Sequence, residues 1–375
     1  MVTEAQALAW LTAWDRQGAH RTATEGDEAG AAWLAGEVRA AGAEVTVERF
    51  AMARVDPVAA EVSFEGQTIG GVAMFDAPDG DIAGLCGPVG QGAEIGVGTV
   101  TPWAVYTEAF RGMRRDSGHQ ALVLATMGGA PGLALLNAEA FNAPYGSPVL
   151  LVDSAHAEPL AAAAARGGRM RMRVRVRAER VPVDACNIVA TIAGADRGRP
   201  PLVIMTPRSS WWTSTSERGG GLVCWLACLH ALRAAPPACD VVFTANSGHE
   251  LGHIGLDAFV ASRPGWETSA TWLHWGANIG AAGGTTSVVS GHEALRTAMS
   301  AFLVAAGVEH AITPGGVVPN GESRDIHRAG GRYISLVGSN PLFHLPQDRL
   351  PGAVDVAAVA QLATGAARMA IALSR

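Results

Sequence analysis

The segment His249-Glu250-Leu251-Gly252-His253 gathers the side chains of this sequence that are best suited to chemistry. A histidine exchanges protons near neutral pH, and a glutamate can accept a proton or bind a metal ion. The order His-Glu-x-x-His also matches a short zinc pattern in which both histidines lie on one face of a helix. Gly248 and Gly252 follow an apolar strand here and indicate a loop that opens a helix, so we do not expect that separate type of zinc site.

Two arginines and several tryptophans add candidate binding groups near the same strands. Arg208 follows one apolar strand, and Arg218 precedes the run of three glycines from 219 to 221. A guanidinium group binds a carboxylate through two hydrogen bonds, so both arginines are candidates for holding an anionic substrate; ion pairing inside the protein is the alternative. The tryptophans are candidates for lining the cleft, or else for packing in the core: Trp211, Trp212 and Trp275.

The elements that position these groups alternate between strands and helices. We expect strands at 202–205 and 240–244, and helices at 221–234 and 252–261. This order predicts a mostly parallel sheet covered by helices, in which ligands bind beyond the carboxyl ends of the strands.

The first half of the chain has a different pattern of predicted elements, with more strands and fewer helices. A helix is predicted at 31–41 and a strand at 43–50, and the stretch 56–102 is rich in Gly, Val and turn residues without helical periodicity. Further strands are expected at 121–125, 148–152 and 169–176. In the last of these, Arg and apolar residues alternate strictly, which predicts a strand with one solvated face. The whole stretch predicts a β-rich insertion.

Composition limits the classes of function. The chain has 375 residues, of which 49% are hydrophobic and 17% charged, and a formal net charge of -6. The length and composition indicate a compact protein of two domains, or of one domain with a large insertion, and the negative net charge argues against a nucleic-acid binder. No uninterrupted apolar run of about 18 residues and no secretion signal are visible, so we expect a cytoplasmic protein without membrane insertion and leave a homo-oligomer open. The five cysteines lack the spacing of a disulfide scaffold, which fits a reducing compartment. Cys224 and Cys228 are expected to be small core residues, with a metal or redox pair as the alternative.

Several separated motifs resemble the zinc aminopeptidase and glutaminyl cyclase superfamily. The likeness covers nearly the whole chain, and the motifs follow the family's order. It rests on Ala19–Asp27, Asn187–Gly194, the glycine run at 219–221, His249–Gly255, Ala329-Gly330, and Phe343-His344-Leu345-Pro346-Gln347-Asp348.

The resemblance implies an α/β fold with a three-layer, mostly parallel sheet of the zinc-aminopeptidase type. Residues 1–54 and 181–375 would form this catalytic domain. Residues 55–180 would form an inserted, β-rich protease-associated domain.

The family's metal ligands are only partly present. Pro207-Arg208-Ser209 stands where the family has His-x-Asp, and Ala277 or Asn278 stands at a later Asp. The resemblance still implies ligands for one zinc ion at Glu217, Glu250 and His344, and it places His249 at the general base. The alternative is that Glu217 pairs with an arginine and no metal binds.

Other polar residues complete the expected site. Asp325 and His327 lie just before Ala329-Gly330, where the family has a Ser-Asp-His cluster near the cleft. Together with Asn278 and the tryptophans, they are candidates for binding the substrate.

Three hypotheses about function follow. The first is a cytoplasmic hydrolase that cleaves an amide or peptide-like bond in a small molecule or short peptide with one zinc ion. The second is a metal-free hydratase, lyase, isomerase or hydrolase that uses His249 and Glu250, with an anionic substrate held by Arg208 and Arg218. The third is a non-catalytic binding protein on the same fold.

Overall fold

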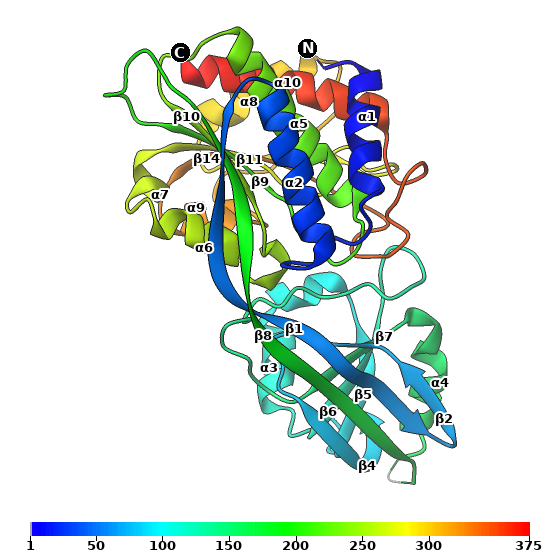
Figure 1. Ribbon diagram of the computed structural model, residues 1–375. Coiled ribbons are helices and arrows are strands. Elements are labelled where there is room, and N and C mark those ends of the chain that lie inside the picture. Colours follow the sequence, from blue (N-terminus) through cyan, green and yellow to red (C-terminus); the bar gives the residue numbers. More distant parts are fainter. Residues whose placement is uncertain (1, 168) are drawn as a thin grey trace.

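Two lobes joined by a long two-stranded ribbon make up the chain (Figure 1). The computed structural model describes residues 2–167 and 169–375. The ribbon consists of β1 (Glu44–Phe64) and β8 (Arg171–Ile192), which pair antiparallel with one register shift between Pro57 and Ala59. The expected domain boundaries at 54/55 and 180/181 therefore fall inside these two strands.

The first lobe contains a mixed sheet with a parallel centre. Its order is β13-β12-β14-β11-β9-β10-β8, and the four strands from β14 to β10 run parallel to one another. β8 and β12 are antiparallel to their central neighbours. The strands are β9 (Leu202–Pro207), β10 (Val241–Asn246), β11 (Thr271–Trp275), β12 (Thr286–Val289), β13 (Ala311–Ile312) and β14 (Arg332–Gly338).

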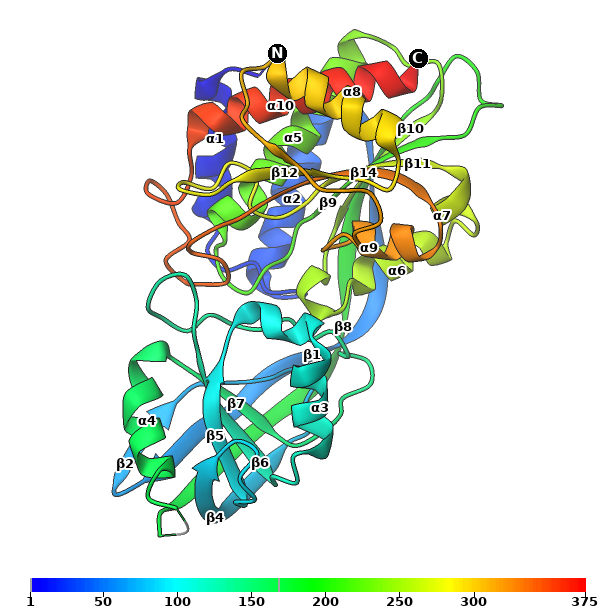
Figure 2. The same ribbon diagram turned by 180° about the vertical axis from the view of Figure 1, so that it is seen from behind.

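Helices cover both faces of this sheet, which gives three layers (Figures 1 and 2). The larger core lies on one face and the smaller on the other, and both are built from apolar strand residues and inward-facing helix residues. This arrangement confirms the predicted α/β class. The first face carries α1 (Glu4–Asp15), α2 (Glu25–Ala40), α5 (Thr215–Ala234), α8 (Glu293–Val304) and α10 (Val356–Ser374); the second carries α6 (Ile254–Ala261), α7 (Trp266–Ser269) and α9 (Ser323–Arg328).

Helix α5 begins six residues before the predicted start at 221. Its glycines allow close packing rather than marking the start of the helix. A Cβ on Gly220 would lie 1.8 Å from the carbonyl oxygen of Ile279, and one on Gly221 would lie 2.7 Å from Thr206 Oγ1. The earlier start places Glu217 and Arg218 in the first turn of α5, at the edge of the sheet where ligands bind.

In the second lobe the sheet continues from β8 into β4, which pairs antiparallel with it. From there β4 to β7 run parallel, and β3 is antiparallel to β7. The alternating arginines of β8 are exposed and the residues between them are buried, as predicted. That this lobe is a protease-associated domain stays a prediction. Its elements are β2 (Gln67–Gly70), β3 (Val72–Ala73), β4 (Gly80–Pro88), β5 (Ile95–Val100), β6 (Ala121–Thr126), β7 (Val149–Val152), α3 (Glu108–Asp116), α4 (Ala157–Ala164), and the short 3-10 helices η1 (Pro102–Tyr106) and η2 (Ser154–His156).

All five cysteines are free and buried. Cys224 and Cys228 lie in the largest core, which confirms the expectation for these two.

Helix α10 has the length and mean hydropathy, 1.5, of a membrane span. It packs along α5, and half of its apolar window is buried inside the structure.

Candidate functional site

The carboxyl ends of the parallel strands face the second lobe (Figure 2). Polar side chains that are buried collect at these strand ends. They follow β9, β10 and β11 in the chain or begin the helices α5 and α9. The site residues from these strands are Arg208 and Ser209 after β9, Asn246 at the end of β10, His249 after β10, and His274 within β11.

Glu217, Arg218 and His344 form one group within this site. Glu217 Oε1 lies 2.9 Å from Arg218 Nη2 and 3.2 Å from His344 Nε2. Burial alone would raise the pKa of Glu217, but the charges of Arg218 and His344 outweigh it and lower the pKa to about 2. Glu217 is therefore an anion at neutral pH. Neither contact is aligned as a hydrogen bond, so the outer nitrogens of Arg218 and both Glu217 oxygens remain without one.

Asp348 fixes the helix that carries this group. Its carboxyl oxygens accept hydrogen bonds from the backbone amides of Ser216 at 2.8 Å and Glu217 at 3.0 Å. These amides belong to the first turn of α5 and have no partner inside the helix. Asp348 thus acts as a distant cap, and Glu217 carries its negative charge at the helix end that favours it.

Glu250 is held by hydroxyl groups. Its Oε1 accepts hydrogen bonds from the Thr22 hydroxyl at 2.6 Å and from the Thr22 amide at 3.2 Å. Its Oε2 accepts one from the Ser209 hydroxyl at 2.6 Å. Both oxygens are therefore engaged within the protein, and they are not available to a substrate or an ion in this arrangement.

Arg208 is also engaged. Its Nη1 lies 2.8 Å from Asp27 Oδ1, and its Nη2 donates to the carbonyl of Cys186 at 2.7 Å. Arg208 and Asp27 are both fully buried, so they form an internal ion pair that ties β9 to α2 and β8. Of the two predicted anion-binding arginines, only Arg218 has unused donors on both outer nitrogens.

His249 faces Glu322, a residue that the sequence analysis did not single out. His249 Nδ1 lies 3.6 Å from Glu322 Oε1, and neither atom has a hydrogen-bond partner. Burial, with the charge of Arg218 adding to it, holds the pKa of His249 well below its usual value. Burial raises the pKa of Glu322 to about 7, although His253 and Asn246 partly oppose it. The pair therefore consists of a neutral imidazole and a carboxyl group that gains and loses its proton near neutral pH.

Two further histidines lie beside this pair, and each is anchored through one ring nitrogen. His253 Nδ1 is 2.5 Å from Asp325 Oδ2, and His274 Nδ1 is 2.7 Å from Ser335 Oγ on the neighbouring strand. The other nitrogen of each ring is buried without a partner. His253 was visible in the His-Glu-x-x-His pattern, whereas nothing local marked His274.

The remaining candidates lie in different surroundings. Trp275 belongs to the largest core, and His327 contacts the Tyr333 hydroxyl at 3.1 Å on the outer helical layer. Trp212 donates to the carbonyl of His344 at 2.9 Å. Asn278 donates its backbone amide to the carbonyl of Glu217, and its side-chain oxygen is unpartnered. The structure thus brings Asn278 and Trp212 next to the site and keeps Trp275 and His327 in packing positions.

The second lobe contacts several residues of the candidate site. The carbonyl of Leu135 lies 2.6 Å from His344 Nδ1, and Asn137 Oδ1 accepts a hydrogen bond from Trp211 at 3.1 Å. Glu139 pairs with Arg324 at 2.8 Å. Trp211 is therefore a contact between the lobes, and the inserted lobe takes part in closing the site.

The zinc ion that the resemblance implies does not fit these residues well. Glu217 and His344 face each other, but the two oxygens of Glu250 are taken up by Thr22 and Ser209. The guanidinium of Arg218 also places a fixed positive charge beside Glu217. Within residues 2–167 and 169–375, no three His, Cys, Asp or Glu side chains are placed to hold a metal ion together.

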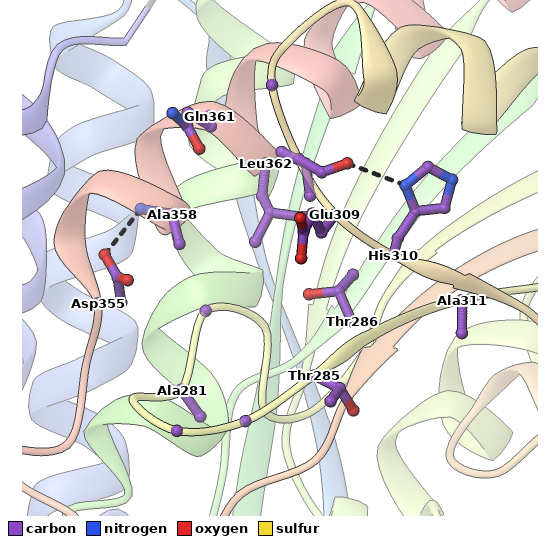
Figure 3. Close-up of a pocket in the computed structure, with 15 residues that line it drawn as sticks. Ala281, Thr285, Thr286, Glu309, His310, Ala311, Asp355, Ala358, Gln361 and Leu362 are labelled. Carbon is purple, nitrogen blue, oxygen red and sulfur yellow. Dashed lines mark hydrogen bonds between the residues drawn. The ribbon is translucent and has the colours of Figure 1, made fainter.

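A separate cavity of about 490 Å³ lies away from these residues (Figure 3). It is bounded by the loop from Gly280 to Thr286, the segment from Gly307 to Ala311, and the start of α10. Its carboxylates, Glu309 and Asp355, are exposed at the surface. The cavity shares no lining residue with the candidate site.

The buried Glu322 leads to a prediction about pH. Its pKa is about 7 in the folded chain against an ordinary 4.5, so the folded chain binds more protons between these values. The free energy of unfolding of the wild type relative to Glu322→Gln should thus be greatest below pH 4.5, and ~3 kcal/mol of it should be lost by pH 8. Urea unfolding of both proteins at pH 5 and pH 8 measures this difference. A constant difference would show that Glu322 ionises normally.

Comparison with solved structures shows the same fold at low sequence identity. A zinc aminopeptidase from Bacillus subtilis is 15% identical, with a TM-score of 0.76 over 97% of this chain and 94% of that one. An aminopeptidase from Aneurinibacillus sp. strain AM-1 is 14% identical, with a TM-score of 0.71 over 97% and 93%. A peptidase M28 precursor from Shewanella amazonensis SB2B is 14% identical, with a TM-score of 0.72 over 99% and 96%.

No family model and no curated protein matches the chain. The structural likeness covers nearly the full length of these aminopeptidases, so this chain has the fold of the zinc aminopeptidases.

Proposed function

We propose that this chain is an enzyme that acts on an amide or peptide-like bond of a small substrate with His249 and Glu322 as its acid–base pair. The observation that supports it is the contact of a neutral imidazole with a carboxyl group of pKa about 7, both buried and both with an unpartnered atom. A carboxyl group with a pKa near the working pH can donate a proton in catalysis, and the neutral imidazole beside it can accept one.

The two groups have complementary roles in hydrolysis. His249 accepts a proton from a water molecule as the water oxygen attacks the carbonyl carbon. Protonated Glu322 donates its proton to the leaving nitrogen. The proton on His249 then returns to Glu322 across the 3.6 Å gap, which restores both groups.

Glu217 and Arg218 supply matching contacts for the substrate. Arg218 has unused N–H donors, and Glu217 has an oxygen, Oε2, with no hydrogen-bond partner. An amide offers a carbonyl oxygen to the first and an N–H to the second. A substrate carboxylate can occupy the Arg218 donors instead, which retains the idea of an anionic substrate with one arginine rather than two.

In this proposal Glu322 takes the role that the metal-free hypothesis gave to Glu250. Glu250 has the wrong surroundings for it, because its oxygens accept hydrogen bonds from Thr22 and Ser209. The same acid–base pair would also support hydration, elimination or isomerisation. A cytoplasmic location remains part of the proposal.

Metal content separates this proposal from the single-zinc hydrolase. We expect less than about 0.1 zinc per chain in protein purified without a metal-affinity tag, because the three proposed ligands do not converge. Elemental analysis measures this, with activity on a panel of small amides, N-acyl amino acids and dipeptides assayed with and without EDTA. About one zinc per chain that is lost in His344→Ala, together with activity that EDTA removes, would overturn the metal-free mechanism.

A binding protein without catalysis is the remaining alternative. It predicts no turnover anywhere in that panel and unchanged ligand binding in His249→Gln. Turnover that requires His249 excludes it.

A further inference from the structure

The acid–base pair is enclosed, and this raises the question of how it exchanges protons with solvent. Glu322 is fully buried, and His249 is 5% exposed. A carboxyl group that titrates near pH 7 must nevertheless gain and lose protons. A chain of groups that leads from the pair to the surface would meet this need.

Such a chain begins at His253, which no step of the proposed reaction uses. The ring of His253 lies 4.8 Å from that of His249 and is tilted 31° to it. Its Nε2 is buried without a partner, as are His249 Nδ1 and Glu322 Oε1. A buried water bonds to two to four unpartnered polar atoms of this kind, so a bridging water is the link that such a chain requires between His253 and the pair.

Asp325 continues the chain to the surface. Its Oδ2 lies 2.5 Å from His253 Nδ1, and its side chain is 31% exposed, whereas that of His253 is 1% exposed. Arg324 and Arg328 lie 3.8 and 3.9 Å from the other oxygen, Oδ1. The positive charges of the two arginines offset the negative charge of Asp325 at Oδ1, and Oδ2 contacts the His253 ring.

The backbone at His253 is held in an uncommon conformation. His253 has φ 65°, in the left-handed region that is uncommon for residues other than Gly, although Asn, Asp and His adopt it more often than most. It directly precedes α6, and Gly252 before it is left-handed as well. This backbone conformation fixes the direction from which the His253 ring enters the site.

We propose that Asp325 and His253 form a proton relay that connects the enclosed His249–Glu322 pair with solvent. A proton from Glu322 reaches His253 Nε2 through the bridging water and makes an imidazolium ion. His253 then releases the Nδ1 proton to Asp325 Oδ2, which passes it to bulk water. Only O–H and N–H bonds form and break, and the reverse path returns a proton to Glu322.

The other charged groups around His253 define the control. The side chain of Asp257, on helix α6, interacts with His253 through charge alone, while its backbone amide donates to the His253 carbonyl at 3.1 Å. His249, His274 and Glu322 face His253 from other elements. Asp257→Asn therefore removes a neighbouring carboxylate without touching the relay. Asp325→Asn keeps an oxygen that can accept the hydrogen bond from His253, but this amide cannot carry a proton.

The test needs no substrate, so its result is independent of the proposed function on which the inference rests. Full-length protein labelled with ¹⁵N-histidine gives the rate at which the His253 Nδ1 proton exchanges with water at pH 7. We expect Asp325→Asn to slow this exchange by about tenfold or more, as for loss of a proton-transfer group, and Asp257→Asn to leave it within about twofold.

A second variant tests the inner end of the relay. In the wild type, the ring nitrogens of His253 should follow the ionisation of Glu322 near pH 7, and Glu322→Gln should remove that step. Unchanged exchange in Asp325→Asn, or a step near pH 7 in the His253 ring-nitrogen signals that Glu322→Gln leaves intact, overturns the relay. A working relay together with full activity in His249→Gln would instead overturn the proposed function alone.

Discussion

Replacing His249 by glutamine is expected to lower the turnover number by about 10²- to 10⁴-fold, the range for loss of a general acid–base group. Glutamine keeps a polar side chain of similar reach but exchanges no proton. Since His249 contacts Glu322 at 3.6 Å and lies close to His253, the change removes the acceptor for the water proton and leaves the binding groups in place. The Michaelis constant should therefore change little.

Steady-state kinetics on the substrate found in the amide panel measure both constants, and Glu322→Gln should show a loss of similar size. His310→Gln is the matched control, because His310 contacts Ser300 and the carbonyl of Val308 beside the remote cavity. Unchanged turnover in His249→Gln would assign the chemistry to other residues. A change confined to the Michaelis constant would give His249 a binding role.

Replacing Arg208 by alanine is expected to lower the free energy of unfolding by about 3–5 kcal/mol, the cost of leaving a buried charge without its partner. Arg208 and Asp27 are both fully buried and lie 2.8 Å apart. Burial raises the pKa of Asp27 and Arg208 opposes this, so the lone carboxyl would take up a proton and limit the loss.

Urea unfolding measures the effect, and the exposed pair Arg173 and Asp81 provides the control, since its removal should change stability little. The double variant Arg208→Met, Asp27→Leu should recover part of the lost stability, because it leaves no buried charge. Substrate affinity reduced in Arg208→Ala at unchanged stability would instead support the earlier interpretation of Arg208 as a substrate clamp.

The second half of the fold could be predicted because its central strands are buried on both faces. Strands such as β9 and β10 are then continuous apolar runs, and the helices between them show their own periodicity. The full length of β1 could not be predicted, because its half-exposed ribbon contains Pro57 and shifts register there. The sequence predicts the start of α5 too late, because its glycines indicate the beginning of a helix. Their actual role is close packing against Ile279, which is distant in the sequence.

The sequence predicts where the candidate site lies, but it predicts only some of the roles of the residues in it. The position of His249 after a strand was enough to place it at the ligand-binding edge. The role of Glu250 depends on Thr22, which is 228 residues away. That of Glu322 depends on its approach to His249 from a different element of the fold. Such long-range partners leave no local pattern, so the sequence favoured Glu250 and Asp325 as the acidic groups of the site.

The antiparallel ribbon of β1 and β8 means that the chain enters and leaves the second lobe through directly paired neighbours. Ala51 and Asp184, for example, face each other in register. A single gain or loss of DNA between two such codons would therefore add or remove the entire lobe and leave only a hairpin to be closed by a short turn. The contact between the Leu135 carbonyl and His344 Nδ1 would be lost with the lobe. One insertion or deletion could therefore add or remove the part of the chain that covers the site.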